Sequence, residues 1–223
     1  MTFEFVLFDL DNTLYSRDSG LLQQIGRRIQ MWLCEHLTLD WEQSAAVRRD
    51  YFLRYGTTLN GLIVERNIDA HDFLTFVHDV PVERYLSPEP ALAAMLSAIP
   101  LRRVIYTNAT TEYSGRVLRA LGVTHLFERV ISIEDVDLRN KLYYEAYERA
   151  LALIGARGPA CIMVEDSARN LGPAKALGMA TVLVGPGDGI DSPDGSVDFA
   201  VPTVLDVGLV VKRLLNNDQP TNS

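Results

Sequence analysis

The sequence lacks long hydrophobic runs and a basic N-terminal segment, and it contains only two cysteines among 223 residues. A membrane-spanning helix needs about 20 consecutive apolar residues, and a secretory signal needs a basic start, so we predict neither. Cys34 lies in a helical pattern and Cys161 in an apolar strand pattern, and we predict that both are buried thiols without a disulfide framework. We therefore expect a cytoplasmic protein that has no membrane partner.

Basic residues are also in deficit, since 21 Lys and Arg stand against 29 Asp and Glu and give a formal net charge of −8. A surface of this charge repels nucleic acids and anionic membranes, so neither is predicted as a partner. Hydrophobic residues at 48% and charged residues at 22% are ordinary values for a globular protein with a full core. An anionic small substrate would need a metal ion and a few basic side chains at its site.

Strand signals are missing from a long block that follows the N-terminal run, and its apolar residues recur with a helical period. Asp40 is a candidate N-cap for a helix over residues 41–55. Residues 56–61 are interpreted as a loop, and residues 69–77 resume a helical face. We predict that residues 16–90 form a helical subdomain. Three aromatic residues are assigned to its core: Tyr51, Phe52 and Tyr55.

Short apolar runs alternate with helical stretches over the remainder of the chain, which is the pattern of a parallel sheet with crossover helices. The first strand is the N-terminal run, residues 3–8. Later strands are predicted over 103–106, 130–133, 161–164, 181–184 and 199–201, and helices over 91–99, 112–121, 142–153, 168–177 and 204–215. We therefore predict an α/β fold, a three-layer Rossmann-like parallel sheet core over residues 1–15 and 91–216. The helical subdomain is an inserted cap, and residues 217–223 form a disordered tail.

Two carboxylates one residue apart, Asp9 and Asp11, end the first strand. Buried carboxylates are unfavourable unless a cation, a proton or hydrogen bonds compensate them, and a divalent metal suits the carboxyl end of a strand. One carboxylate can attack phosphorus to form an acyl phosphate, while the other protonates the leaving oxygen and then activates water. The alternative is a polar turn in which residues 11–13 only cap a helix.

Two later strands also end in polar residues, and the carboxyl ends of parallel strands share one edge of the sheet. Thr107 and Asn108 would donate hydrogen bonds to phosphate oxygens, and Glu165 and Asp166 would complete an acidic metal site. Helix capping is the alternative role of both pairs. Lys141 is predicted to open the helix after the third strand and to pair with the nucleophile and the phosphoryl group. Its alternative is a solvated surface lysine.

Four motifs in chain order resemble those of the haloacid dehalogenase superfamily of phosphatases, and the resemblance covers essentially the whole chain. Residues 9–13 resemble the first motif and Thr107–Asn108 the second. Lys141 resembles the third, and Glu165–Ser167 with Asn170 resembles the fourth. The helical block ahead of Ala91 resembles the helical cap of that superfamily.

The resemblance implies roles for the acidic residues. Asp9 would be the nucleophile and Asp11 the general acid/base. Mg²⁺ would be held by the Asp9 carboxylate, the Asp11 backbone carbonyl and Asp166, with Glu165 close by.

Within the superfamily, residues 9–15, 55–62 and 76–80 resemble the pyrimidine 5′-nucleotidase branch. This implies a Mg²⁺-dependent phosphatase of pyrimidine nucleoside 5′-monophosphates such as UMP and CMP. The alternative substrate is another small organic phosphate, such as phosphoglycolate or a sugar phosphate. Asn60 and His78 are the cap candidates for contacting the substrate, with turn formation and helix capping as their alternative roles.

One departure from the branch and two alternative functions complete the prediction. The branch usually has a proline after the motif lysine, whereas Leu142 follows it here, a difference that bears on how the lysine is placed. Dehalogenation on the same fold needs neither a metal nor a general acid, so the presence of Asp11 and Asp166 disfavours it. A receiver-like signalling module would carry its phosphoacceptor on a later strand and would need no cap, and only the loop residues Asp135 and Asp137 lie in that region.

Overall fold

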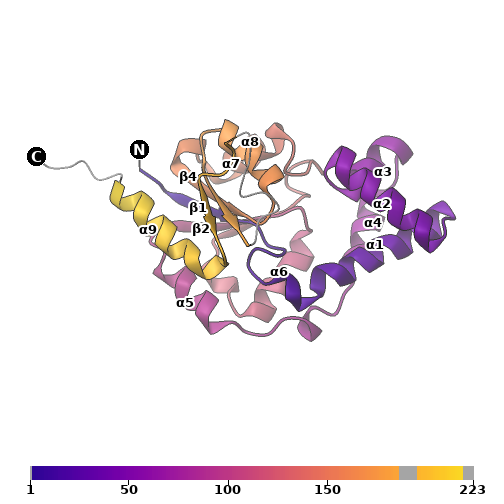
Figure 1. Cartoon of the computed structure of the whole chain (residues 1–223), viewed down its shortest axis with the longest axis horizontal. Helices are drawn as coiled ribbons and strands as arrows, with labels where there is room; N and C mark the ends of the chain where they lie inside the picture. The colour runs from indigo at the N-terminus through magenta and orange to yellow at the C-terminus, as the bar shows by residue number, and fades with distance from the viewer. Residues whose placement is uncertain (1, 186–194, 218–223) are drawn as a thin grey trace, which may run out of the picture.

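The computed structural model describes residues 2–185 and 195–217, and its centre is one parallel β-sheet (Figure 1). The strands lie in the order β3-β2-β1-β4-β5-β6, and every neighbouring pair is parallel. Their bounds are β1 Phe5–Phe8, β2 Arg102–Tyr106, β3 Arg129–Ile131, β4 Cys161–Glu165, β5 Ala180–Val184 and β6 Phe199–Val201. The predicted α/β class is confirmed.

Strand β1 lies in the middle of the sheet and is paired on both sides. Phe5 lies opposite Arg102 of β2 and opposite Cys161 of β4. A strand covered on both faces is expected to be apolar at every position, and all four residues of β1 are buried. The N-terminal run is therefore hydrophobic without alternation because it has no solvent face.

Helices cover both faces of the sheet and make the three predicted layers (Figure 1). Val6 and Phe8 belong to the apolar cluster on one face, and Phe5 and Leu7 to the cluster on the other. Successive side chains of a strand point to opposite faces, so β1 contributes to both clusters. The first face is covered by α5 Pro90–Ala98, α6 Thr111–Leu121 and α9 Val207–Asn217, and the second by α7 Tyr144–Ile154 and α8 Ala168–Ala176.

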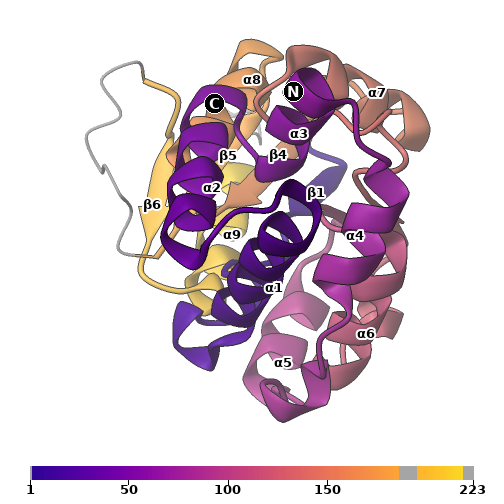
Figure 2. The same cartoon turned by 90° about the vertical axis from the view of Figure 1, so that its right-hand side faces the viewer.

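Four helices form a separate layer at one end of the molecule (Figures 1 and 2): α1 Leu21–Leu37, α2 Trp41–Tyr55, α3 Thr58–Arg66 and α4 Ala70–His78. They pack around an apolar cluster of their own, which includes Trp32, Tyr51, Leu62 and Phe73. Helix α2 begins where the sequence predicts, because Asp40 and Gln43 form a capping box.

The loop predicted over residues 56–61 is wrong in part, because α3 begins at Thr58. The Thr57 hydroxyl accepts a hydrogen bond from the Asn60 backbone N–H and so caps this helix. Gly61 resembles a loop residue in the sequence, but it allows α2 and α3 to approach closely. A Cβ atom at this position would lie 2.4 Å from Cγ of Tyr51.

Three other predictions need correction. Cys161 is buried as expected, but Cys34 is only half-buried. Phe52 is not part of the helical core, since 51% of it is exposed. Asn217, assigned to the disordered tail, ends α9, and residues 218–223 of that tail lie outside the described residues.

No helix in residues 2–185 and 195–217 is both long enough and apolar enough to cross a membrane.

Candidate active site

The turn that follows β1 places Asp9 at the edge of the sheet. The Asp9 backbone N–H continues the ladder by donating to the Val164 carbonyl at 2.9 Å. Asn12 then adopts the left-handed conformation with φ 61°, which an asparagine tolerates better than most residues. The chain turns back, and the Thr13 hydroxyl donates to Oδ2 of Asp9 at 2.9 Å. The carboxylate is 7% exposed, so it is both held in place and largely removed from water.

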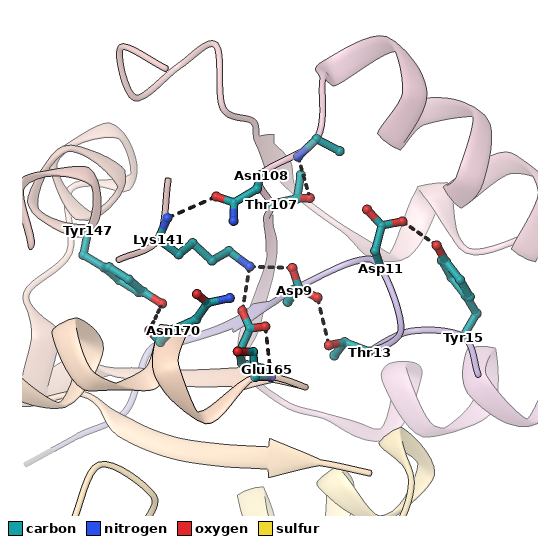
Figure 3. Close-up of polar contacts among 12 residues, drawn as sticks. Asp9, Asp11, Thr13, Tyr15, Thr107, Asn108, Lys141, Tyr147, Glu165 and Asn170 are labelled. Carbon is teal, nitrogen blue, oxygen red and sulfur yellow. Dashed lines mark hydrogen bonds and ion pairs between the residues drawn. The ribbon is translucent and has the colours of Figure 1, made fainter. Parts of the chain in front are cut away.

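Lys141 reaches this carboxylate from the opposite side (Figure 3). Its Nζ donates to Oδ1 of Asp9 at 2.5 Å and to Oε2 of Glu165 at 2.8 Å. The side chain is 1% exposed, which excludes the solvated surface lysine. Lys141 does not open a helix as predicted, because it lies in the turn that precedes α7, which begins at Tyr144.

The buried charges shift one another's proton affinities. Burial raises the pKa of Glu165 to about 8 and raises the pKa of Asp9, while Lys141 opposes both shifts. Burial alone would lower the pKa of Lys141, but the two carboxylates raise it above its ordinary value. The lysine is therefore a cation at neutral pH, held between the carboxylates of Asp9 and Glu165.

Carboxylate oxygens of Asp9, Glu165 and Asp166 all lie within 4.8 Å of one another. Hard oxygen ligands of this kind suit Mg²⁺, so the donor set of the described residues fits the predicted metal. Asp166 also pairs with Arg17, whose Nη2 lies 3.0 Å from its Oδ2. The predicted metal residues Asp9, Glu165 and Asp166 are thus brought together at the end of two adjacent strands.

Asp11 lies two residues after Asp9 and is held by two tyrosines, of which Figure 3 shows Tyr15. Tyr15 donates its hydroxyl to Oδ1 of Asp11, and Tyr113 donates to the same oxygen at 2.8 Å. Burial raises the pKa of Asp11 to about 6, against the effect of these two hydrogen bonds. A carboxyl group whose pKa lies near neutrality can both give and take a proton.

Thr107 and Asn108 follow β2 at the same edge. The Thr107 hydroxyl accepts from the Ala109 backbone N–H at 3.0 Å, and the residue is 1% exposed. Oδ1 of Asn108 accepts from the Lys141 backbone N–H at 3.1 Å. Neither residue caps the following helix, because Thr110 is the N-cap of α6.

The turn that carries Lys141 is fixed by Asn140, which sequence reasoning missed. Nδ2 of Asn140 donates to the Tyr55 carbonyl at 2.7 Å and to Oδ1 of Asn60 at 2.6 Å. Its Oδ1 accepts from the Leu142 backbone N–H at 2.9 Å. A proline at position 142 has no N–H to give, so leucine in place of proline supplies a hydrogen bond that holds this turn.

Asn60, a predicted cap candidate, lies in α3 and contacts the turn before α7. Its Oδ1 accepts from Thr57 and Asn140, and its Nδ2 donates to the Leu138 carbonyl at 2.9 Å. Both ends of the amide are thus used between α3 and the turn before α7. Asn60 connects these two parts of the chain instead of facing a cavity.

A cavity of about 620 Å³ lies between α1–α4 and the edge of the sheet. Asp11, Asn108 and Ala109 line it from the sheet side, and His78 lines it from the end of α4. The His78 ring stacks on Tyr113 with centroids 4.7 Å apart. Burial lowers the pKa of His78 to about 4, so the ring is neutral at neutral pH. Of the two cap candidates, His78 faces the cavity.

Several residues at the site carry little signal in the sequence. Tyr15 and Asn140 adjoin recognisable motifs, so their neighbourhood could have directed attention to them. Arg17 and Tyr113 lie in ordinary local sequence, and only the tertiary fold brings them to Asp166 and Asp11.

Comparisons with known proteins give relatives in sequence and in fold. A sequence family described as haloacid dehalogenase-like hydrolase matches residues 3–178. The chain is 23% identical over 193 residues to Phosphate metabolism protein 8 of Saccharomyces cerevisiae, which covers 79% of this chain but only 60% of that protein. It is 27% identical to Glyceraldehyde 3-phosphate phosphatase of Methanocaldococcus jannaschii, covering 94% of this chain and 97% of that protein. Among solved structures, L-2-haloacid dehalogenase from Xanthobacter autotrophicus has a TM-score of 0.60 at 19% identity, covering 95% of this chain and 99% of that one, a likeness of fold.

Proposed function

Because the chain belongs to the haloacid dehalogenase-like hydrolase family, we propose that it is a Mg²⁺-dependent phosphomonoester hydrolase acting through an aspartyl phosphate on Asp9. The observation that carries this proposal is the meeting of Asp9, Lys141, Glu165 and Asp166 at one sheet edge, with Asp11 beside them. A dehalogenase needs neither an acid/base at position 11 nor an acidic metal site, so this set favours phosphate chemistry.

In the proposed reaction, an oxygen of Asp9 attacks phosphorus while the bond to the ester oxygen breaks. Asp11 gives its proton to the leaving oxygen, and the alcohol departs. Asp11 then takes a proton from water, the hydroxide attacks the phosphorus of the aspartyl phosphate, and inorganic phosphate leaves with Asp9 restored. Lys141, Thr107 and Asn108 would neutralise or bind the phosphoryl oxygens. Mg²⁺, held by Asp9, Asp166 and the Asp11 backbone carbonyl with Glu165 adjacent, would offset the repulsion between the carboxylate and the phosphate group.

We propose pyrimidine nucleoside 5′-monophosphates as the substrates, with residues 16–90 acting as the cap that selects the leaving group. The cavity between these helices and the sheet is large enough for a ring-sized leaving group. The relative from Methanocaldococcus jannaschii, named for a three-carbon phosphate, favours a small organic phosphate as the second candidate.

A substrate panel tests the proposal. Phosphate release is measured with Mg²⁺ and with EDTA from UMP, CMP, phosphoglycolate, glyceraldehyde 3-phosphate and a sugar phosphate. We expect release to require Mg²⁺ and to be fastest from UMP or CMP. Rapid release only from the small phosphates would select the second candidate, and turnover that survives EDTA would exclude the metal-dependent mechanism.

The matched variant is Asp9→Asn, which keeps the shape of the side chain but removes the nucleophile. We expect no turnover and no phosphorylated protein, whereas wild type should give an acid-stable phosphorylated species when quenched during turnover. Turnover by Asp9→Asn would exclude Asp9 as the nucleophile.

A further inference from the structure

Arg48 of α2 is a cation that has no counter-ion among the described residues. It lines the cavity between α1–α4 and the sheet, and its side chain is only half-buried. Within residues 2–185 and 195–217, no hydrogen bond or ion pair to its guanidinium is found, whereas Arg28 and Arg54 of the neighbouring helix surfaces both have such partners. Burial lowers the pKa of Arg48, which marks a charge partly removed from water without compensation.

The packing leaves space for this guanidinium. Gly26 of α1 faces Arg48, and a Cβ atom at position 26 would lie 2.8 Å from Nη2 and 3.1 Å from Nη1 of Arg48. Any residue larger than glycine would therefore push the guanidinium away from its place. Glycine in the middle of a helix lowers helix stability, and at position 26 it leaves room for the guanidinium.

The walls around Arg48 suit a flat, mostly apolar group. Leu22, Ile25 and Ile29 of α1 line the same cavity. Phe52 lies four residues after Arg48, so both side chains lie on one face of α2, and its exposed ring also lines the cavity. A planar guanidinium beside an aromatic ring and aliphatic walls can bind the edge of a ring that carries an acceptor oxygen.

We propose that Arg48 is a specificity-determining residue that donates hydrogen bonds to an acceptor oxygen on the leaving group, namely a carbonyl oxygen of a pyrimidine-sized ring. This inference rests on the proposed phosphatase function and deepens it. The phosphate would lie at Asp9 and Lys141, and the far end of the leaving group would lie at Arg48, on the cap side of the cavity. A carboxylate on a small leaving group offers the same acceptor chemistry and is a separate arm of the test.

The first experiment compares kcat/KM for UMP, 3-phosphoglycerate and phenyl phosphate, whose ring has no acceptor oxygen. We expect Arg48→Met to lower the ratio of kcat/KM for UMP to that for phenyl phosphate by about 10- to 100-fold, the effect of a hydrogen bond to a charged group. Gly26→Ala should lower the same ratio, because its methyl group displaces the guanidinium while alanine favours the helix. Arg27→Met is the matched control: Arg27 is exposed on α1 and does not line the cavity, so the ratio should stay unchanged.

A selective loss for 3-phosphoglycerate in place of UMP would keep Arg48 as the acceptor-binding residue and assign it to a carboxylate. An equal loss for all three substrates, or no loss for any, would overturn the inference. Calorimetry with Mg²⁺ in the Asp9→Asn background measures UMP binding without turnover, and so separates the binding role of Arg48 from the reaction. If wild type releases no phosphate from any substrate, the proposed function fails. The inference about Arg48 would then be overturned as well if UMP does not bind, or if Arg48→Met leaves the Kd for UMP unchanged.

Discussion

Asp11 is positioned by side chains and not only by its place in the first motif. Tyr15 comes from the chain that leaves the turn and Tyr113 from α6, and both donate to a single oxygen of the carboxyl group. The two phenol groups therefore fix the direction of the other oxygen. The acid/base role proposed for Asp11 requires such a fixed geometry, because the group must reach both the leaving oxygen and water.

Removal of these hydroxyls tests their role. We expect Tyr15→Phe with Tyr113→Phe to lower kcat by about tenfold or more, because each hydrogen bond to a charged group contributes roughly 1.5–3 kcal/mol. The KM for phenyl phosphate should change little, since neither hydroxyl is placed to bind the phosphate. Steady-state kinetics with Tyr143→Phe, which removes a hydroxyl from an exposed ring, provide the control. An unchanged kcat in the double variant would show that Asp11 needs no such support.

At this scale the sequence predicts which residues meet better than it predicts their surroundings. Asp9, Lys141, Glu165 and Asp166 converge as expected, because each follows or adjoins the carboxyl end of a parallel strand. The burial of Lys141 was not predictable, because it depends on neighbours from β1 and β4 that are distant in the chain. The contacts of Asn60 with Asn140 depend on tertiary packing in the same way.

At the scale of elements, the hydrogen-bonded side-chain amides of Asn60 and Asn140 join the helical layer to the turn that carries Lys141. Asn140 reaches the Tyr55 carbonyl and Asn60, and Asn60 reaches back to the Leu138 carbonyl. Gly56 makes this junction close: its φ is 82°, and a Cβ atom there would lie 2.5 Å from Cδ1 of Leu142. The start of α3 and the segment before α7 are thus one structural unit.

We expect Asn140→Ala to destabilise this unit and to slow catalysis together. Loss of the side chain leaves Oδ1 of Asn60 and the Leu142 backbone N–H without this partner, at a cost of roughly 1–3 kcal/mol in the free energy of unfolding. Since Lys141 is the next residue, kcat should also fall. Urea denaturation and steady-state kinetics measure the two effects, and Asn216→Ala, at an exposed position of α9, is the control. A loss of stability without a change in kcat would limit Asn140 to a structural role.

The elements themselves were predictable where the pattern was regular. The strands and the helices around the sheet follow the predicted order, because short apolar runs, such as those of β1 and β4, alternate along the chain with amphipathic stretches. Helix α3 was missed because its glycine at position 61 was read as a loop signal, whereas its function is close packing against Tyr51. A glycine required by a neighbouring helix cannot be told from a glycine required by a turn until the packing is known.

At the scale of the whole molecule, the two cysteines report on different layers. Cys161 lies in β4 with no exposed surface, and burial raises the pKa of its thiol to about 12. Cys34 lies on α1 and is half-buried. We expect a thiol reagent such as DTNB at pH 8 to modify Cys34 in the folded protein and Cys161 only after unfolding, because the thiolate is the reactive form. Rapid modification of Cys161 in native protein, identified by mass spectrometry, would show that the sheet opens locally.

The central position of β1 has a consequence for synthesis on the ribosome. This strand is made first, yet its partners β2 and β4 begin at residues 102 and 161. The four apolar residues of β1 and the adjoining Asp9 therefore stay unpaired while the intervening helices are synthesised and fold from local contacts. We expect nascent chains that stop before β4 to expose the unpaired β1 segment and to bind chaperones that shield such segments.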